Sequence, residues 1–304
     1  MIQINKIKPK IRKTSKADLG FDIFNYFLLS IVLLAAIYPL YFIIIASISN
    51  PDAINSGRVF LFPRDITFAG YEKIFADKLI WSSYFNTIKY TVIGVLINIT
   101  LTMFMAYPLS LKNFAGKKFI TIFLLITMYF NGGLIPTYLV VDSLGLVNQW
   151  QVMVLLGAVN VFNVIIARAF LQNSIPEEIF EAATIDGCSY AQYFFKMIVP
   201  LSKPIIAVLV LYYGAAHWNE YMKALIYIRD EALYPLQLVL RSILIQNDVS
   251  MDMVANMDEL LEKQKAAELI KYGVIIVSSM PLIAAYPFVQ KYFVQGSMVG
   301  AVKG

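Results

Sequence analysis

Long stretches without a charged residue constrain this chain more than any other feature. Five such runs occur, at Ile23–Ser49, Tyr90–Leu111, Phe119–Val141, Ser143–Ala167 and Tyr272–Gln290. A sixth, Pro204–Ile228, is interrupted only by Glu220 and Lys223. A helix needs about 20 apolar residues to cross a bilayer, at about 1.5 Å of rise per residue. The pattern predicts an all-α integral membrane protein with six transmembrane helices in one domain, residues 21–295.

The charges support a membrane protein and indicate its orientation. Only 15% of the 304 residues are charged, against roughly 25% in soluble domains. Six basic residues precede the first acid, Asp18: Lys6, Lys8, Lys10, Arg12, Lys13 and Lys16. Basic flanks stay on the cytoplasmic side, so the N-terminal tail, residues 1–20, and after six spans the C-terminal tail, residues 296–304, are predicted to be cytoplasmic. The net charge of +5 therefore points to lipid rather than nucleic acid.

Two long connections become external loops in this topology, residues 50–83 and 229–271. The first carries several aromatic residues and reads as a collar at the level of the lipid headgroups. In the second, Val254, Met257, Leu260 and Leu261 recur at helical spacing among acidic residues. This spacing predicts an amphipathic helix outside the membrane.

The cytoplasmic connection 172–199 has strong local signals. Ser174 and Glu177 have capping-box spacing, with Pro176 in the first turn, and predict a short helix that ends near Gly187. Ser189 is positioned to cap a second short helix, and Pro200 opens the next span. From these residues alone the pair is either a docking element for a cytoplasmic partner or a plain interfacial helix pair.

The same connection resembles a known signature. Glu181-Ala182-Ala183, three residues, Gly187, nine residues, and Met197-x-Val199-Pro200 resemble the EAA motif of ABC-importer membrane subunits. Other segments resemble the carbohydrate branch typified by the maltose permease: Ile185-Asp186-Gly187, Trp218-Asn219, Tyr234-Pro235-Leu236-Gln237, Tyr286-Pro287-Phe288 and the ending Gly300–Gly304. The segment Phe130–Tyr138 further resembles the subgroup that imports oligosaccharides derived from complex polysaccharides.

The resemblance implies a type I ABC importer permease in a bacterial cytoplasmic membrane, forming half of an oligosaccharide pathway by alternating access. Its partners would be a second, related permease chain, two ATPases and an extracytoplasmic sugar-binding protein. The implied ATPase-coupling residues are Glu181, Ala182, Ala183, Asp186, Gly187 and Pro200. The tail Gly300, Ala301, Val302, Lys303 and Gly304 would enter the interface between the ATPases, unless Lys303 is only a membrane-flanking cation.

Catalysis is not expected in this chain. It has no Gly-x-x-x-x-Gly-Lys-Ser/Thr loop to hold phosphates, so ATP and Mg would be used by the partner ATPase. One cysteine, Cys188, and one histidine, His217, offer no internal disulfide and no Cys/His metal site. A membrane enzyme is disfavoured, because no span carries paired carboxylates or a histidine cluster.

Polar residues within the spans are candidates for a sugar cavity, because polar groups at membrane depth need partners or water. We single out Asn131, Asn163, Trp218 and Asn219. The alternatives are interhelical hydrogen bonds for the amides and the interfacial aromatic belt for Trp218. An ion-coupled secondary transporter is the competing function, but its ionisable candidates, such as Glu220 and Lys89, lie in the outer parts of their spans.

Overall fold

The computed structural model describes residues 16–249, 270–284 and 287, and within these the regular structure is helical. The chain divides into two compact units between Thr67 and Phe68. Each unit is described on its own.

The first unit is dominated by α1, Lys16–Ser47, a helix of 32 residues. Between Leu19 and Ile44 its large apolar side chains are mostly exposed on all sides, an arrangement that suits a helix surrounded by lipid. The short helix α2, Pro51–Asn55, follows, and the side chain of Asn50 caps it by accepting from the backbone N–H of Asp52 at 2.9 Å. Ile45, Ala53 and Val59 form the small core that joins the two helices.

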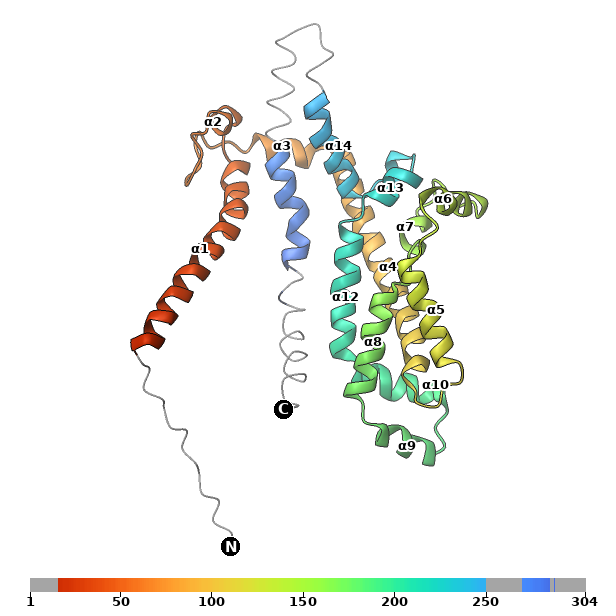
Figure 1. Ribbon diagram of the computed structural model, residues 1–304. Coiled ribbons are helices and arrows are strands. Elements are labelled where there is room, and N and C mark those ends of the chain that lie inside the picture. Colours follow the sequence, from red (N-terminus) through yellow and green to blue (C-terminus); the bar gives the residue numbers. More distant parts are fainter. Residues whose placement is uncertain (1–15, 250–269, 285–286, 288–304) are drawn as a thin grey trace. The chain divides into compact units, whose positions relative to one another are not determined.

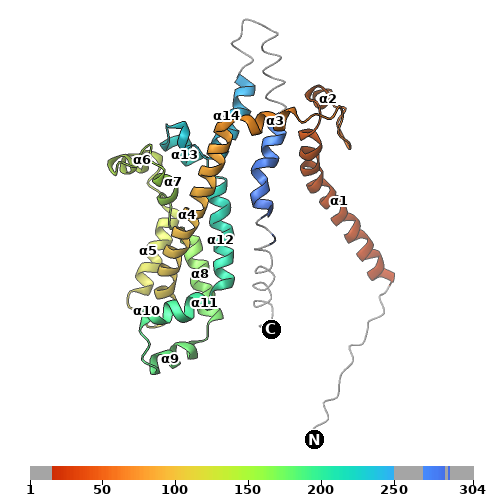
Figure 2. The same ribbon diagram turned by 180° about the vertical axis from the view of Figure 1, so that it is seen from behind.

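The second unit is organised around α4, Lys78–Ser110, which has 33 residues. The carboxylate of Asp77 caps its start by accepting from the backbone N–H of Leu79 at 2.8 Å. Helices α8, Val161–Ser174, and α12, Lys203–Trp218, run along α4 (Figures 1 and 2) and bury apolar residues against it. Helix α5, Lys117–Tyr129, packs beside α8.

Shorter elements gather at the two ends of this bundle (Figure 1). At one end, here called the α9 end, lie α9, Glu177–Ile185, α10, Tyr190–Tyr193, a π-helical turn, Phe194–Ile198, and α11, Val199–Leu201. At the other, here called the α14 end, lie α3, Ala69–Ala76, α6, Leu134–Ser143, α7, Gln151–Leu155, α13, Met222–Tyr227, a 3-10 turn, Glu231–Leu233, and α14, Leu236–Val249. A further apolar helix, Ile270–Ala284, carries Val274 into the core formed with Ile74 and Leu236.

The uncharged run Phe119–Val141 is not the single straight helix that hydropathy predicts. It forms α5 and α6, which are bent by 111° at the break between them. The break follows from Asn131-Gly132-Gly133: Gly133 has φ of +88°, and the Asn131 side chain accepts from the backbone N–H of Gly133 at 2.9 Å. Glycine adopts this backbone conformation readily, and the Asn turn competes with the helix.

Two other predicted spans are also interrupted. In Ser143–Ala167 the helix stops after Leu155, and Gly157 takes φ of +78°. Asn160 then caps α8 by accepting from the backbone N–H of Asn163 at 3.2 Å. In Pro204–Ile228 the helix stops after Trp218, and α13 begins only at Met222. Before α12, the segment Tyr190–Leu201 meets that helix at 77°.

Two of the described helices are long and apolar enough to cross a bilayer, Leu19–Ser47 within α1 and the whole of α4. The number rises to four if each bent pair, α5 with α6 and Tyr190–Leu201 with α12, counts as one span. Ile270–Ala284 is apolar but shorter.

Candidate functional site

The short helix α9 ends as the sequence predicts but begins differently. Its N-cap is Pro176, and no side chain caps it, so the predicted capping box between Ser174 and Glu177 is wrong. Residues that precede a proline are driven to extended backbone, and Ile175 has φ of −110° and ψ of 111°. The helix therefore cannot include Ser174.

Gly187 closes α9, as predicted. It has φ of +74°, and two hydrogen bonds form a Schellman motif around it. The backbone N–H of Gly187 donates to Thr184 at 3.1 Å and that of Cys188 donates to Ala183 at 2.9 Å. The chain consequently turns sharply out of α9.

The cap at Ser189 is also confirmed. Its hydroxyl accepts from the backbone N–H of Gln192 at 3.3 Å, and the Gln192 side chain accepts from the backbone N–H of Ser189 at 3.0 Å. This reciprocal capping box starts α10. Pro200 lies in α11, just before the bend into α12.

The two faces of α9 differ in chemistry. Ala183 is 6% exposed and packs into the core of the second unit. Glu181, Ala182 and Asp186 are exposed. Ile185 is 87% exposed, which is the highest exposed fraction among the large apolar side chains that the structure describes. The outward face therefore combines acidic, small and apolar groups, while the inward face packs through Ala183.

Ile185 was not among the coupling residues expected from the sequence. Its signal is present, because it directly precedes Asp186-Gly187, but an isolated isoleucine next to a turn reads equally well as core. Only the structure shows that its side chain lies on the outward face of α9 with Glu181, Ala182 and Asp186.

Two polar contacts link the end of α4 to the connection 172–199, one through the start of α9 and one through the end of α8. Lys112, just after α4, forms an ion pair with Glu177 at the start of α9. This hydrogen bond and the carboxylate charge raise the pKa of the Lys112 ammonium. The Gln172 side chain donates to the carbonyl of Ser110 at 3.3 Å. Both contacts are exposed, so they orient the connection more than they stabilise it.

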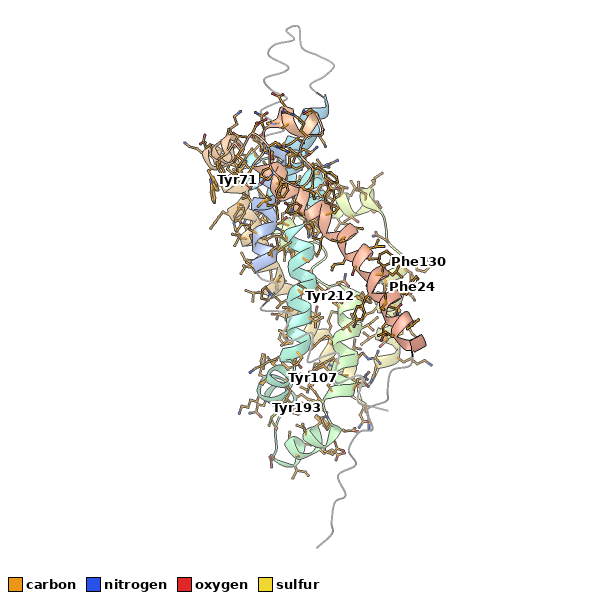
Figure 3. The ribbon with its side chains drawn as sticks, turned by 90° about the vertical axis from the view of Figure 1, so that its left-hand side faces the viewer. Phe24, Tyr71, Tyr107, Phe130, Tyr193 and Tyr212 are labelled. Atoms are coloured by element: carbon orange, nitrogen blue, oxygen red, sulfur yellow. The ribbon has the colours of Figure 1, made fainter. Side chains whose placement is uncertain are left out.

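Aromatic rings form the inner attachment. Tyr193 packs edge-on against Phe180 with centroids 5.2 Å apart, and lies 6.2 Å from Tyr107 of α4; Figure 3 shows Tyr107 and Tyr193 together at this end. Burial raises the pKa of the Tyr193 hydroxyl. A pocket of about 830 Å³ separates this cluster from the α4–α5 connection.

A second group of polar contacts joins α4 to α12 midway along the bundle. His217 and Asn98 are 2.8 Å apart at Nε2 and Oδ1, and Asn98 donates to the carbonyl of Ala158 at 2.6 Å. One helical turn away, the hydroxyls of Thr102 and Tyr213 are 2.7 Å apart. These bonds tie the break between α7 and α8 to both long helices.

A third group fixes the backbone near α14. The Asn86 side chain donates to the carbonyls of Ala232 and Tyr234, at 2.7 and 3.1 Å. Thr87 accepts from the backbone N–H of Leu236 at 2.8 Å. The start of the long loop 229–271 is thus anchored to α4, while residues 250–269, with the predicted amphipathic helix, lie outside the described residues.

The four cavity candidates lie in different surroundings. Trp218 is 5% exposed; its indole N–H donates to the carbonyl of Ser278 at 3.0 Å, and its ring meets Tyr84 edge-on. Asn163 is buried in the first turn of α8. Asn131 and Asn219 are exposed, and Asn219 donates to the carbonyl of Ala215 at 2.8 Å. Among the described hydrogen bonds, none joins any of these four side chains to another. The predicted tail Gly300–Gly304 lies outside the described residues.

Residues 74–298 match the family described as "Binding-protein-dependent transport system inner membrane component". Protein LplC of Bacillus subtilis (strain 168) is 37% identical over 290 residues, covering 95% of this chain and 97% of that protein. The polygalacturonan/rhamnogalacturonan transport system permease protein YtcP of the same strain is 38% identical over 285 residues, with 93% and 98% covered.

Among solved structures, one chain from the crystal structure of a bacterial ABC transporter involved in the import of the acidic polysaccharide alginate is similar throughout. The TM-score is 0.82 at 37% identity, and the match covers 92% of this chain and 98% of that one. The similarity therefore includes the whole helical bundle rather than one motif.

Proposed function

We propose, from the premise that this chain belongs to the family of binding-protein-dependent transport system inner membrane components, that it is the membrane-spanning permease subunit of an ATP-driven oligosaccharide importer. The outward face of α9 carries this proposal. Glu181, Ala182, Ile185 and Asp186 form an exposed docking surface directly before the Gly187 turn. A partner ATPase, using ATP and Mg, would bind this face.

The contacts around α9 provide a route from the docking surface to the spans. Movement of α9 reaches α10 through Phe180 and Tyr193, and α4 through Tyr107. It also reaches α12 through the chain itself, by way of the π-helical turn and the bend near Pro200. Alternating access would follow when the ATPases close and tilt these helices together.

Our proposed topology has six spans in a bacterial cytoplasmic membrane. They are α1, α4, α5 continued by α6, α8, α12, and the helix that includes Ile270–Ala284. The α9 end faces the cytoplasm together with both chain termini, and the α14 end faces outward. The basic residues before Asp18 support this orientation.

The proposed partners are a second permease chain, two ATPases and an extracytoplasmic sugar-binding protein. Residues Gly300–Gly304 would lie between the ATPases. For the sugar cavity, Asn131 and Asn219 offer accessible amides, while Trp218 and Asn163 would support the lining from behind, because both are buried in this chain. One similar protein is named for a polygalacturonan/rhamnogalacturonan transport system, and the similar structure is of a transporter involved in alginate import. Both favour a saccharide cargo.

Uptake into proteoliposomes tests this function. The complete transporter, with ATP inside and sugar-loaded binding protein outside, should accumulate labelled oligosaccharide. Uptake should stop without ATP and persist when ionophores remove all ion gradients. Uptake that requires an ion gradient and proceeds without ATP would replace the proposal by an ion-coupled secondary transporter.

A further inference from the structure

We infer that the α14 end of the bundle selects acidic oligosaccharides through two pairs of a cation and an aromatic ring, Lys89 with Trp150 and Arg241 with Tyr221. This inference rests on the proposed import function and adds the charge of the cargo.

Each pair places a positive charge on the face of a ring. The Lys89 ammonium lies 4.3 Å from the centroid of Trp150, and the Arg241 guanidinium carbon lies 5.0 Å from that of Tyr221. All four residues are half-buried. The two rings pack on one hydrophobic cluster, which includes Tyr90 and Tyr227. The pairs therefore belong to one region, built from α4, α7, α13 and α14.

The cations of the two pairs are not neutralised by the described part of the chain. Among the side chains that the structure describes, no ion pair joins Lys89 or Arg241 to a carboxylate. Lys223, in the same region, shows the contrast, because its ammonium lies 3.3 Å from the Glu220 carboxylate. Holding a cation in a partly buried, membrane-level site is costly unless an anion accompanies it. A ring face offsets only part of that cost.

A uronate unit supplies what these pairs lack. The apolar face of its pyranose ring can stack on an indole or phenol ring, while its carboxylate accepts charge-assisted hydrogen bonds from an ammonium or guanidinium group. An ammonium has three donors, so Lys89 can keep its ring contact and still bind a carboxylate. Two cations without a carboxylate partner among the described side chains would also attract acidic sugars to the α14 end and favour them over neutral ones.

The similar proteins agree with this chemistry. Galacturonan chains are polymers of uronate, and one similar protein is named for polygalacturonan and rhamnogalacturonan. The similar transporter structure is described as importing alginate, an acidic polysaccharide.

The test compares two sugars that differ only at the carboxyl group. The complete transporter in proteoliposomes, with one binding protein throughout, is given digalacturonate or its neutral counterpart, galactobiose. Lys89→Met and Arg241→Met remove a charge but retain an apolar stem. Each should lower digalacturonate uptake about tenfold, and galactobiose uptake should change by less than about twofold. Lys89→Arg should retain the preference, and Lys78→Met, an exposed lysine on the same helix, should behave as wild type.

Three results would overturn the inference. If each Met variant lowers the uptake of both sugars equally, the two cations have a structural role or bind lipid headgroups. Unchanged digalacturonate uptake in both variants would show that Lys89 and Arg241 do not select the cargo. Wild-type uptake of galactobiose without digalacturonate would refute acidic selection and leave the import function standing. A wild-type complex that carries neither these sugars nor any other saccharide would instead refute the proposed function itself.

Discussion

Asn98 of α4 and His217 of α12 are joined by a buried hydrogen bond of 2.8 Å. Because the Asn98 amide nitrogen donates to the carbonyl of Ala158 at 2.6 Å, its oxygen accepts, and the network assigns the His217 proton to Nε2. The two helices and the break between α7 and α8 are thereby linked at one point. We expect these three segments to move as one body during transport, because separating them would leave buried polar groups unpaired.

Gly94 makes room for this pair. A Cβ atom on Gly94 would lie 2.4 Å from Nε2 of His217, and the ring cannot withdraw without losing Asn98. Gly94→Ala should therefore destabilise the purified protein by about 1–3 kcal/mol. The loss should be clearly smaller in a His217→Ala background, where the methyl group has space.

Thermal unfolding of the wild type, Gly94→Ala, His217→Ala and the double variant in one detergent measures this coupling. Gly214→Ala on α12 is the control, since a Cβ there meets no atom within 4 Å. An equal loss from Gly94→Ala in both backgrounds would show that the two residues do not interact as described.

Ile185 should contribute directly to ATPase binding. Burying an isoleucine side chain is worth roughly 1.5–3 kcal/mol, so Ile185→Ser should weaken association of this subunit with the ATPase about tenfold or more. Ile185→Leu, which keeps an apolar side chain of the same size, provides the matched control and should bind as wild type. Affinity is measured with purified ATPase and the reconstituted permease pair. If Ile185→Ser binds the ATPase with wild-type affinity, the Ile185 side chain does not contribute to the interface.

Gly187 allows backbone geometry to be tested without steric conflict. A Cβ atom on Gly187 would meet no atom within 4 Å. A substitution at this position therefore tests only whether the new residue can adopt the φ of +74°. Gly187→Pro cannot adopt this angle and should abolish sugar uptake while membrane insertion persists. Gly187→Asn should retain most uptake, because asparagine tolerates the left-handed region. Similar uptake by both variants would show that the turn does not set the direction of coupling.

The Lys112–Glu177 pair should tune coupling modestly. Glu177→Lys or Lys112→Glu should each lower stimulated ATPase activity roughly two- to fivefold, and the double exchange should restore it. Glu177 raises the pKa of the Lys112 ammonium. The stabilising effect of this ion pair is therefore fully present below the ordinary lysine pKa, and it is lost as the pH rises through the raised pKa of Lys112.

Lys112→Met removes the ammonium, so it should lower stimulated ATPase activity, and by the same factor at every pH between about 6 and 9. ATPase assays across this range decide the point. A deficit that disappears as the medium becomes mildly alkaline would contradict the assigned cause.

The elements predicted best are those specified by neighbouring residues. The cap at Ser189 and the turn at Gly187 depend on residues within one or two turns, and both have the expected geometry. The breaks at Gly133 and Gly157 were missed because hydropathy is averaged over a window in which one glycine changes little. A straight span was therefore expected where local backbone freedom bends the chain.

Long-range pairs could not be predicted from the sequence. Asn98 and His217 are separated by 119 positions, and nothing local indicates that either would find the other. Trp218 could equally have been a lipid-facing ring or a sugar platform, until the structure placed its indole N–H against Ser278. The direction of Ile185 likewise depends on how α9 packs through Ala183.

Stimulation of ATPase activity by sugar-loaded binding protein tests the central claim most directly. The reconstituted wild-type complex should hydrolyse ATP faster when loaded binding protein is added, and Glu181→Ala should lose most of that stimulation. The Glu181 side chain is exposed on α9, so this variant should keep its membrane fold and its spans. Equal stimulation in wild type and Glu181→Ala, with full sugar uptake in both, would contradict the claim that α9 couples this permease to its ATPase.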